Sequence, residues 1–233
     1  MDPLAHWEDP RTALHYARAA VQVGLWKSEQ LLAERHLPRT ARILELGCGA
    51  GRIALGLEQA GWADVTPTDV ARAMVDLANG VLAERGSRLR AQVADARALP
   101  FADGAFDAAL FGFNGLMCIR GRGERARALA DIRRVLRPGG LLLLTAHDRE
   151  RGESRAHWRN ATAPAEGELG DRWHDSESSP VFIHAGTEAE TTAELTDAGF
   201  AIVETAMRSE IADEPPAVRA FSDDTRWFVA RRD

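Results

Sequence analysis

A strand-like apolar run, three alternate glycines and a second apolar run follow one another in residues 43–55, ILELGCGAGRIAL. Glycine has no Cβ, so Gly47, Gly49 and Gly51 allow a tight turn and let the backbone approach a ligand closely. A strand before this turn and a helix after it would direct free amide groups toward one edge of a sheet. Ligands of doubly wound α/β folds bind at the carboxyl edge of the strands. The segment therefore predicts a doubly wound α/β fold with a ligand site at the carboxyl edge of its strands.

Short apolar runs alternate with amphipathic segments along most of the chain. The apolar runs predict strands at residues 42–46, 63–68, 88–93, 106–111, 141–146, 200–204 and 227–230. The amphipathic segments predict helices at residues 51–60, 70–85, 123–136 and 187–198. Strands that alternate with helices indicate an α/β fold with a parallel, doubly wound sheet. The unbroken leucine run at 141–144 is typical of a strand that is covered on both faces.

Two parts of the chain do not follow this alternation. We expect residues 1–40 to form an N-terminal helical cap, and residues 41–233 to form the main domain. An insertion at about residues 148–186 is rich in Ser, Gly, Glu and Arg and fits no regular element. Long segments of this kind in a compact domain are lids, binding loops or disordered stretches. We expect a lid-like insertion, and the sequence leaves disorder open as the alternative.

Charge and hydropathy limit the classes of partner. The formal net charge is -6 and the pI is about 5.7, which disfavours binding to the phosphate backbone of nucleic acids. No run approaches the roughly 20 apolar residues of a membrane span, and the first residues lack the order of a secretory signal. Cys48 and Cys118 show neither a disulfide pattern nor a zinc-binding spacing. We expect a cytoplasmic protein without nucleic-acid or membrane partners.

A dinucleotide site is the first candidate for such a glycine turn. Its fingerprint needs a third glycine for close packing of the helix on the strand, and this chain has Arg52 at that position. The difference weakens the case for a nicotinamide-dependent oxidoreductase, which stays open as an alternative.

Further motifs follow the glycine turn in order. They are Asp69 at the end of the second predicted strand, VADA at 93–96 with LPF at 99–101, FDAALF at 106–111 and RVLRPGG at 134–140. Together with ELGCGAGR at 45–52, these motifs resemble those of the class I S-adenosylmethionine-dependent methyltransferases. The resemblance covers about residues 41–147 and, more weakly, residues 187–232. It implies a Rossmann-like, doubly wound, mostly parallel sheet of seven strands, with an antiparallel last strand inserted between its neighbours.

The resemblance also implies a cofactor, S-adenosyl-L-methionine, which becomes S-adenosyl-L-homocysteine as the product. The glycine turn would lie against the methionine half, and Glu45 would hold the methionine ammonium directly or through water. Asp69 would accept both ribose hydroxyls, and Asp95 would accept the adenine amino group. The implied cofactor-binding residues are Glu45, Gly47, Gly49, Gly51, Asp69, Val70, Asp95, Ala96, Phe113 and Asn114.

Simpler structural roles compete with these assignments. The glycines would also suit an ordinary strand–helix turn, and Asp69 and Asp95 would suit helix N-caps, where carboxylates are favoured. Glu45 would also suit an ion pair with a nearby arginine. The order and spacing of all the motifs favour the cofactor.

The implied reaction transfers the sulfonium methyl group to an oxygen, nitrogen or carbon atom of a small molecule. Because the methyl group is already activated, alignment and exclusion of water can supply much of the rate. His147 ends the fifth predicted strand at the sheet edge, and it is the candidate general base. A structural role for this histidine is the alternative.

The absence of two motifs limits the class of methyl acceptor and argues against a metal ion. After the fourth predicted strand the chain lacks the Asn/Asp-Pro-Pro-aromatic motif of enzymes that methylate DNA bases or protein glutamine. We therefore expect a small-molecule acceptor. No carboxylate cluster resembles the magnesium site of catechol-type methyltransferases, so we expect no metal. A non-catalytic cofactor-binding or scaffold protein is the alternative function, and the oligomeric state is not predicted.

Overall fold

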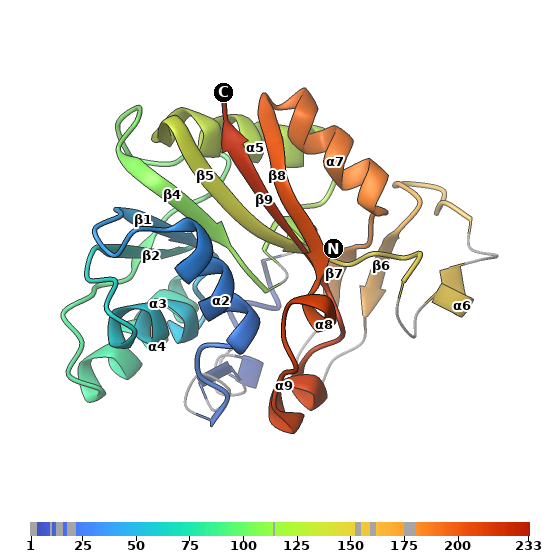
Figure 1. Ribbon diagram of the computed structural model, residues 1–233. Coiled ribbons are helices and arrows are strands. Elements are labelled where there is room, and N and C mark those ends of the chain that lie inside the picture. The colour runs from blue at the N-terminus through green and yellow to red at the C-terminus, as the bar shows by residue number, and fades with distance from the viewer. Residues whose placement is uncertain are drawn as a thin grey trace.

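A seven-stranded sheet runs through the structure in the order β3-β2-β1-β4-β5-β9-β8 (Figure 1). This computed structural model describes residues 4–9, 11–12, 16–17, 22–113, 115–151, 155–158, 162–174 and 180–233. The strands are β1 (Ile43–Leu46), β2 (Val65–Asp69), β3 (Gln92–Val93), β4 (Phe106–Phe111), β5 (Leu136–Ala146), β8 (Phe200–Met207) and β9 (Arg226–Arg232). Neighbours from β3 to β5 are parallel, whereas β9 is antiparallel to both β5 and β8. The predicted sheet with an inserted antiparallel last strand is confirmed.

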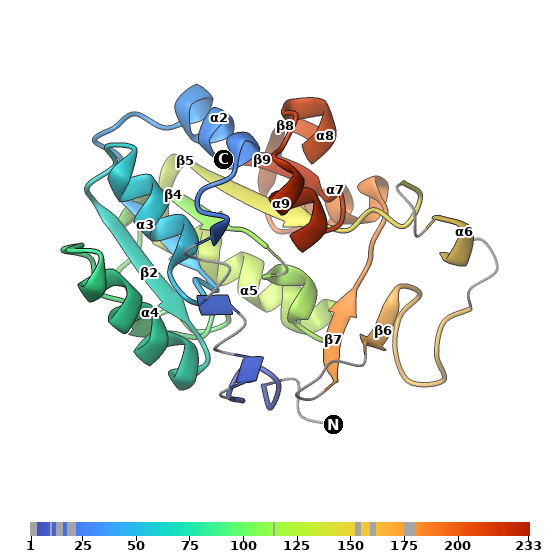
Figure 2. The same cartoon turned by 90° about the horizontal axis from the view of Figure 1, so that it is seen from below.

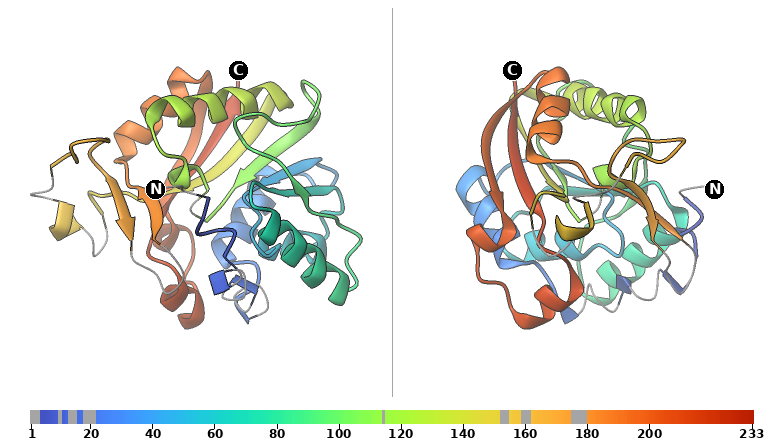
Figure 3. Two further views of the ribbon diagram at one scale, coloured as in Figure 1. Left: turned by 180° about the vertical axis from the view of Figure 1, so that it is seen from behind. Right: turned by 90° about the vertical axis from the view of Figure 1, so that its right-hand side faces the viewer.

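Helices cover both faces of the sheet. The longer ones are α2 (Lys27–His36), α3 (Arg52–Gln59), α4 (Arg72–Glu84), α5 (Arg122–Val135) and α7 (Glu188–Asp197). The shorter ones are η1 (Leu116–Cys118), α6 (Arg155–Trp158), α8 (Arg208–Ile211) and α9 (Pro216–Phe221). Apolar side chains of α2, α3 and α4 form one buried cluster with the sheet, and those of α5 and α7 form another. Helix α5 lies behind the strands in Figure 1 and in front of them in the left view of Figure 3.

Side chains along β4 and β5 alternate between these two clusters. Ala109, Leu142 and Leu144 pack on the side of α5, whereas Leu110 and Leu143 pack on the side of α3. This is the two-residue period of a strand. Because both faces of β5 are covered, its leucines form the unbroken apolar run that the sequence shows.

The insertion contains a two-stranded sheet that the sequence analysis missed. Strand β6 (Asp171–His174) pairs antiparallel with β7 (Val181–His184), and the Trp173 and Phe182 rings lie 5.5 Å apart between centroids. Figure 2 shows β6, β7 and α6 at the opposite end of the molecule from α4. The expectation that this segment fits no regular element is therefore wrong for these two strands. Each strand has only four residues, too few for a clear two-residue pattern.

Helix α2 lies within the predicted N-terminal cap and packs on the face of the sheet that carries α3. The extent of the cap stays a prediction, because residues 1–3, 10, 13–15 and 18–21 lie outside the described ranges. Over the described part of the chain, no helix combines the length and the apolar character that a bilayer crossing requires.

Candidate functional site

A cavity of about 360 Å³ lies at the carboxyl ends of β1, β2 and β4. Its volume falls within the range of small-molecule sites. The sequence-predicted residues in its lining are Glu45, Gly47, Gly49, Asp69, Val70, Asp95, Ala96 and Phe113. The structure thus brings together every described member of the predicted set except Gly51. Asn114 lies outside the described residues.

The three glycines of the turn have positive φ angles, which side chains rarely allow: +63° at Gly47, +52° at Gly49 and +79° at Gly51. A Cβ added at Gly49 would meet nothing within 4 Å, so Gly49 leaves open space in the lining. A Cβ at Gly51 would lie at an ordinary contact distance of 3.5 Å from Ala78 on α4, so the positive φ angle at the start of α3, and not lack of space, favours glycine there. The first part of the turn forms the cavity wall, and the last part positions α3.

Glu45 places a buried carboxyl group in the cavity wall. Only 1% of the residue is exposed, and its Oε2 atom has no hydrogen-bond partner within the described structure. Burial raises the pKa of this carboxyl to about 8, although the positive charge of Arg52 opposes the rise. An unpaired buried carboxylate is costly until a cation or donor reaches it. The group therefore fits the methionine ammonium that the resemblance assigns to it.

Asp69 combines a cavity position with two local hydrogen bonds. Its Oδ2 accepts from the Gly49 amide and its Oδ1 accepts from the Ala71 amide, each at 2.9 Å. Burial raises the pKa of Asp69, while these amides oppose the rise. The local role considered as an alternative is therefore present, and it coexists with the position in the cavity. Each carboxylate oxygen keeps a second lone pair, which suits acceptance from ribose hydroxyls.

Asp95 is held by an arginine that the sequence analysis missed. The guanidinium of Arg97 bonds to Asp95 at 2.7 Å and to Glu124 at 2.8 Å, and the Arg97 amide donates to Asp95 at 2.9 Å. The hydrogen bonds from the Arg97 side chain lower the pKa of Asp95. Asp95 is thus an oriented carboxylate beside Ala96, as an adenine contact requires. No sequence signal marks Arg97 among the many arginines of the chain.

Aromatic rings form a second part of the lining. Phe113 and Phe221 stack with centroids 5.2 Å apart and planes 24° apart. Tyr16 meets Phe113 at 6.2 Å and Phe221 at 6.3 Å, and Trp7 lies 5.6 Å from Tyr16. These four rings, the aromatic wall, all line the cavity. Phe221 lies on α9, and no local pattern in the sequence indicates its role.

An ion pair and a hydrogen bond at a helix start hold the N-terminal segments against the site. Arg52 bonds to the Glu29 carboxylate at 2.6 and 2.7 Å, and its guanidinium carbon lies 4.4 Å from the Trp26 ring centroid. The Glu8 carboxylate accepts from the Arg72 amide at 2.8 Å, at the start of α4. Arg52, which replaces the third glycine of the dinucleotide fingerprint, thus joins α3 to α2 and to the segment that precedes α2.

His147 lies outside the lining of the cavity. It follows β5 at the sheet edge, as predicted, and its amide donates to the Met117 sulfur at 2.7 Å. Burial lowers the pKa of the imidazole to about 4, and nearby Asp223 opposes this shift. The side chain is therefore neutral near pH 7. Its role as a base stays a prediction.

Two further side chains near the site, Cys48 and Met117, belong to buried apolar clusters. Cys48 lines the cavity but packs with Val75, Ala78 and Ala91, and burial raises the pKa of its thiol well above the ordinary value. The thiol is therefore not an activated nucleophile. Met117 belongs to the buried cluster on the α5 side of the sheet.

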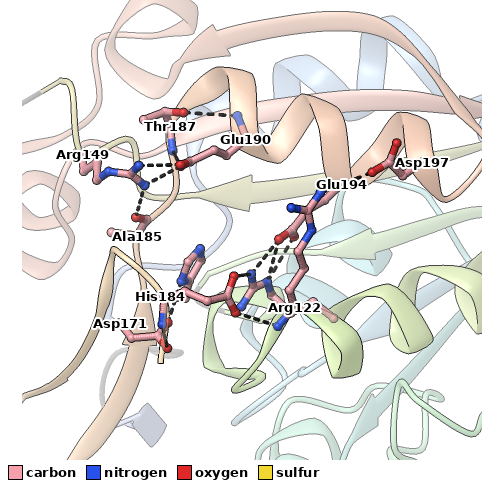
Figure 4. A network of polar contacts seen from close by, with 11 residues as sticks. Arg122, Arg149, Asp171, His184, Ala185, Thr187, Glu190, Glu194 and Asp197 are labelled. Carbon is pink, nitrogen blue, oxygen red and sulfur yellow. Dashed lines mark hydrogen bonds and ion pairs between the residues drawn. The ribbon is translucent and has the colours of Figure 1, made fainter. Parts of the chain in front are cut away.

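A polar network joins the insertion to α5 and α7 (Figure 4). Ligand-type atoms of Glu168, His184 and Glu194 all lie within 4.8 Å of one another. The guanidinium of Arg125 bonds to Glu168 at 3.0 Å and to Glu194 at 2.6 Å, and His184 contacts Asp171 at 2.7 Å. The arginine already compensates both carboxylates, so the network is an anchor for the hairpin.

Comparisons with known proteins find similarity to methyltransferases. Residues 43–140 match the family described as Methyltransferase domain. Over 132 residues the chain is 38% identical to the demethylmenaquinone methyltransferase of Thermus thermophilus, covering 56% of this chain and 53% of that protein. It is 27% identical over 205 residues to an O-methyltransferase of Pyrenophora dematioidea, covering 86% and 68%.

The comparison with solved structures shows a shared fold. A crystal structure of an S-adenosylmethionine-dependent methyltransferase from Methanosarcina mazei superposes with a TM-score of 0.72 at 23% identity, covering 86% of this chain and 96% of the other. The chain spans about half the length of several relatives that it matches in sequence. Residues 43–140 are thus similar to a methyltransferase domain, and the chain shares its fold with a solved S-adenosylmethionine-dependent methyltransferase.

Proposed function

We propose that the protein transfers a methyl group from S-adenosylmethionine to an oxygen, nitrogen or carbon atom of a small molecule. The observation that carries this proposal is the unpaired, buried Glu45 oxygen beside an open glycine turn, in one cavity with Asp69. When bound, the cofactor supplies a methyl group whose carbon–sulfur bond breaks, leaving its electron pair on sulfur, as the acceptor atom bonds to the carbon.

The chain's own residues bind and orient both reactants. Glu45 holds the ammonium, Asp69 holds the ribose hydroxyls, and Asp95 with the Ala96 amide holds the adenine. The aromatic wall excludes water from the space beside the methionine end. This arrangement makes alignment the main source of rate.

His147 is the proposed base for an acceptor that must lose a proton. Its neutral imidazole can accept a proton, but a pKa of about 4 makes it a weak base at pH 7. The variant His147→Gln tests this role against Glu84→Gln, an exposed change on α4. Slower transfer with unchanged cofactor binding supports the role, and unchanged transfer refutes it.

Formation of S-adenosylhomocysteine in the presence of phenol, amine and carbon-acid acceptors tests the function itself. A non-catalytic cofactor-binding or scaffold protein uses the same cavity but gives no turnover with any acceptor. We propose a cytoplasmic protein whose partner is a small-molecule acceptor, with no nucleic-acid or membrane partner. The similarity of residues 43–140 to a methyltransferase domain favours this proposal over a nicotinamide-dependent oxidoreductase.

A further inference from the structure

The cavity lining divides into a polar part and an aromatic part. The polar part, with Glu45, Asp69 and Asp95, comes from the sheet edge and matches the needs of the cofactor. The aromatic wall comes from the N-terminal segment, the end of β4 and α9. Phe113 lies three residues after Leu110, which pairs with Glu45 on the neighbouring strand, so the aromatic wall adjoins the proposed methionine end of the cavity.

The rings of the aromatic wall contact one another without being fully covered. Tyr16, Phe113 and Phe221 each approach the other two, at centroid distances between 5.2 and 6.3 Å. These three residues, like Trp7, are of intermediate exposure and line the cavity, and Phe113 also has the Trp26 ring as an edge-to-face neighbour at 5.6 Å. Aromatic rings prefer stacked and edge-to-face neighbours, so the ring surface that lines the cavity suits a planar apolar ligand.

Charges in the lining argue against an anionic ligand. Arg52 is engaged by Glu29, and Arg97 is engaged by Asp95 and Glu124. Arg120 is exposed and donates to the Glu166 carbonyl at 3.3 Å. Phosphate and carboxylate recognition relies on guanidinium groups directed at the ligand, and two of the three arginines in the described lining, Arg52 and Arg97, are already paired with carboxylates of the protein.

Given the proposed methyl transfer, on which this step rests, we infer that the acceptor is a neutral aromatic molecule whose ring packs against Phe113, Phe221 and Tyr16. The acceptor's nucleophilic atom then lies beside the methionine end of the cavity. Aliphatic acceptors gain less from this wall, because they lack the ring interactions that aromatic pairs add to burial.

Calorimetric titration of the protein saturated with S-adenosylhomocysteine tests this inference. The probes are 1-naphthol, its saturated counterpart decahydro-1-naphthol, and 1-naphthyl phosphate. The expected result is that 1-naphthol binds about tenfold more tightly than either of the others, because the saturated alcohol lacks the aromatic pair interactions and the phosphate carries a charge that the lining does not pair. Equal binding of the saturated alcohol, tighter binding of the phosphate, or no binding of 1-naphthol at millimolar concentration would overturn the inference.

Leucine variants keep an apolar side chain of similar size but remove the aromatic ring, so they test the contribution of the ring itself. Phe221→Leu and Tyr16→Leu should each weaken 1-naphthol binding by about threefold to tenfold and change S-adenosylhomocysteine binding less than about twofold. The control is Phe101→Leu, whose ring packs edge-on against Phe106 at 5.0 Å outside the cavity, and it should change neither. Equal weakening of both ligands would assign the rings to the cofactor and overturn the inference. Failure of S-adenosylhomocysteine to bind the unmodified protein would instead defeat the proposed function.

Discussion

At the scale of single residues, burial of the Glu45 carboxyl group affects the stability of the protein and bears on the proposed contact with the cofactor. Its oxygen is buried without a partner among the described residues, and burial raises its pKa to about 8. Proteins commonly keep such destabilising groups where a ligand needs them. A bound ammonium would complete the site by pairing with the carboxylate and stabilising its ionised form.

Glu45→Gln should stabilise the protein without ligand at alkaline pH. Since the pKa is raised in the folded state, the stabilisation from a protonated Glu45 is fully present near pH 4 and is lost as the pH rises to about 8. The variant has no ionisable group there, so its free energy of unfolding should exceed that of the wild type by about 1–3 kcal/mol at pH 8.5 and by less at pH 5. Urea unfolding at both pH values measures this difference. A variant less stable than the wild type at pH 8.5 contradicts the account.

Local sequence signals reveal some site residues and not others. Asp69 and Asp95 stand at fixed places after predicted strands, so the order of the motifs is enough to indicate them. Arg97, Phe221 and Trp7 follow no such pattern, because their roles depend on contacts between distant segments. Glu45 is predicted from its position in the glycine motif, whereas its unpaired oxygen becomes evident only from the packing around it.

At the scale of elements, the joint between α3 and α2 depends on one buried ion pair. Arg52 and Glu29 are 9% and 2% exposed, and both oxygens of the carboxylate bond to the guanidinium. Removal of one partner from a buried pair leaves the other charge uncompensated. This pair also places a positive charge near Glu45, which opposes the rise of the Glu45 pKa.

Arg52→Met should lower the free energy of unfolding by about 3 kcal/mol, because Glu29 is then buried without its partner. The double variant Arg52→Met with Glu29→Met should recover part of this loss, which a double-mutant cycle in urea quantifies. Arg85→Met, an exposed change after α4, is the matched control and should have little effect. A loss below about 1 kcal/mol in the single variant would show that the pair contributes little.

The hairpin of β6 and β7 should depend on Arg125 and not on a metal ion. Arg125→Met should accelerate amide hydrogen exchange in β6 and β7, because it removes the bonds from α5 to Glu168 and Glu194. Exposed Arg127→Met is the control. The chelator EDTA should change neither this exchange nor methyl transfer. Faster exchange or lost transfer with EDTA would point to a metal and contradict the predicted absence of one.

At the scale of the whole molecule, the sheet was largely predictable and the completed cavity was not. The seven strands follow from the apolar runs, and the inserted antiparallel β9 follows from the family resemblance. The cavity also needs Trp7 and Tyr16 from the beginning of the chain and Phe221 from near its end. Such contacts arise only when the sheet brings distant segments together. The position of His147 could not be predicted for the same reason. The sequence places it at the sheet edge, but it does not show that the residue lies outside the cavity lining.

The central claim, that this cavity binds S-adenosylmethionine, is tested most directly by calorimetric titration with S-adenosylmethionine and S-adenosylhomocysteine. The wild type should bind both in the micromolar range. Glu45→Gln should weaken binding by at least about tenfold, as loss of a charged hydrogen bond predicts, and exposed Glu84→Gln should not. Glu45 suits this test better than Asp69, whose two amide bonds also support the local backbone. No binding of either ligand, or equal binding by Glu45→Gln, would contradict the account.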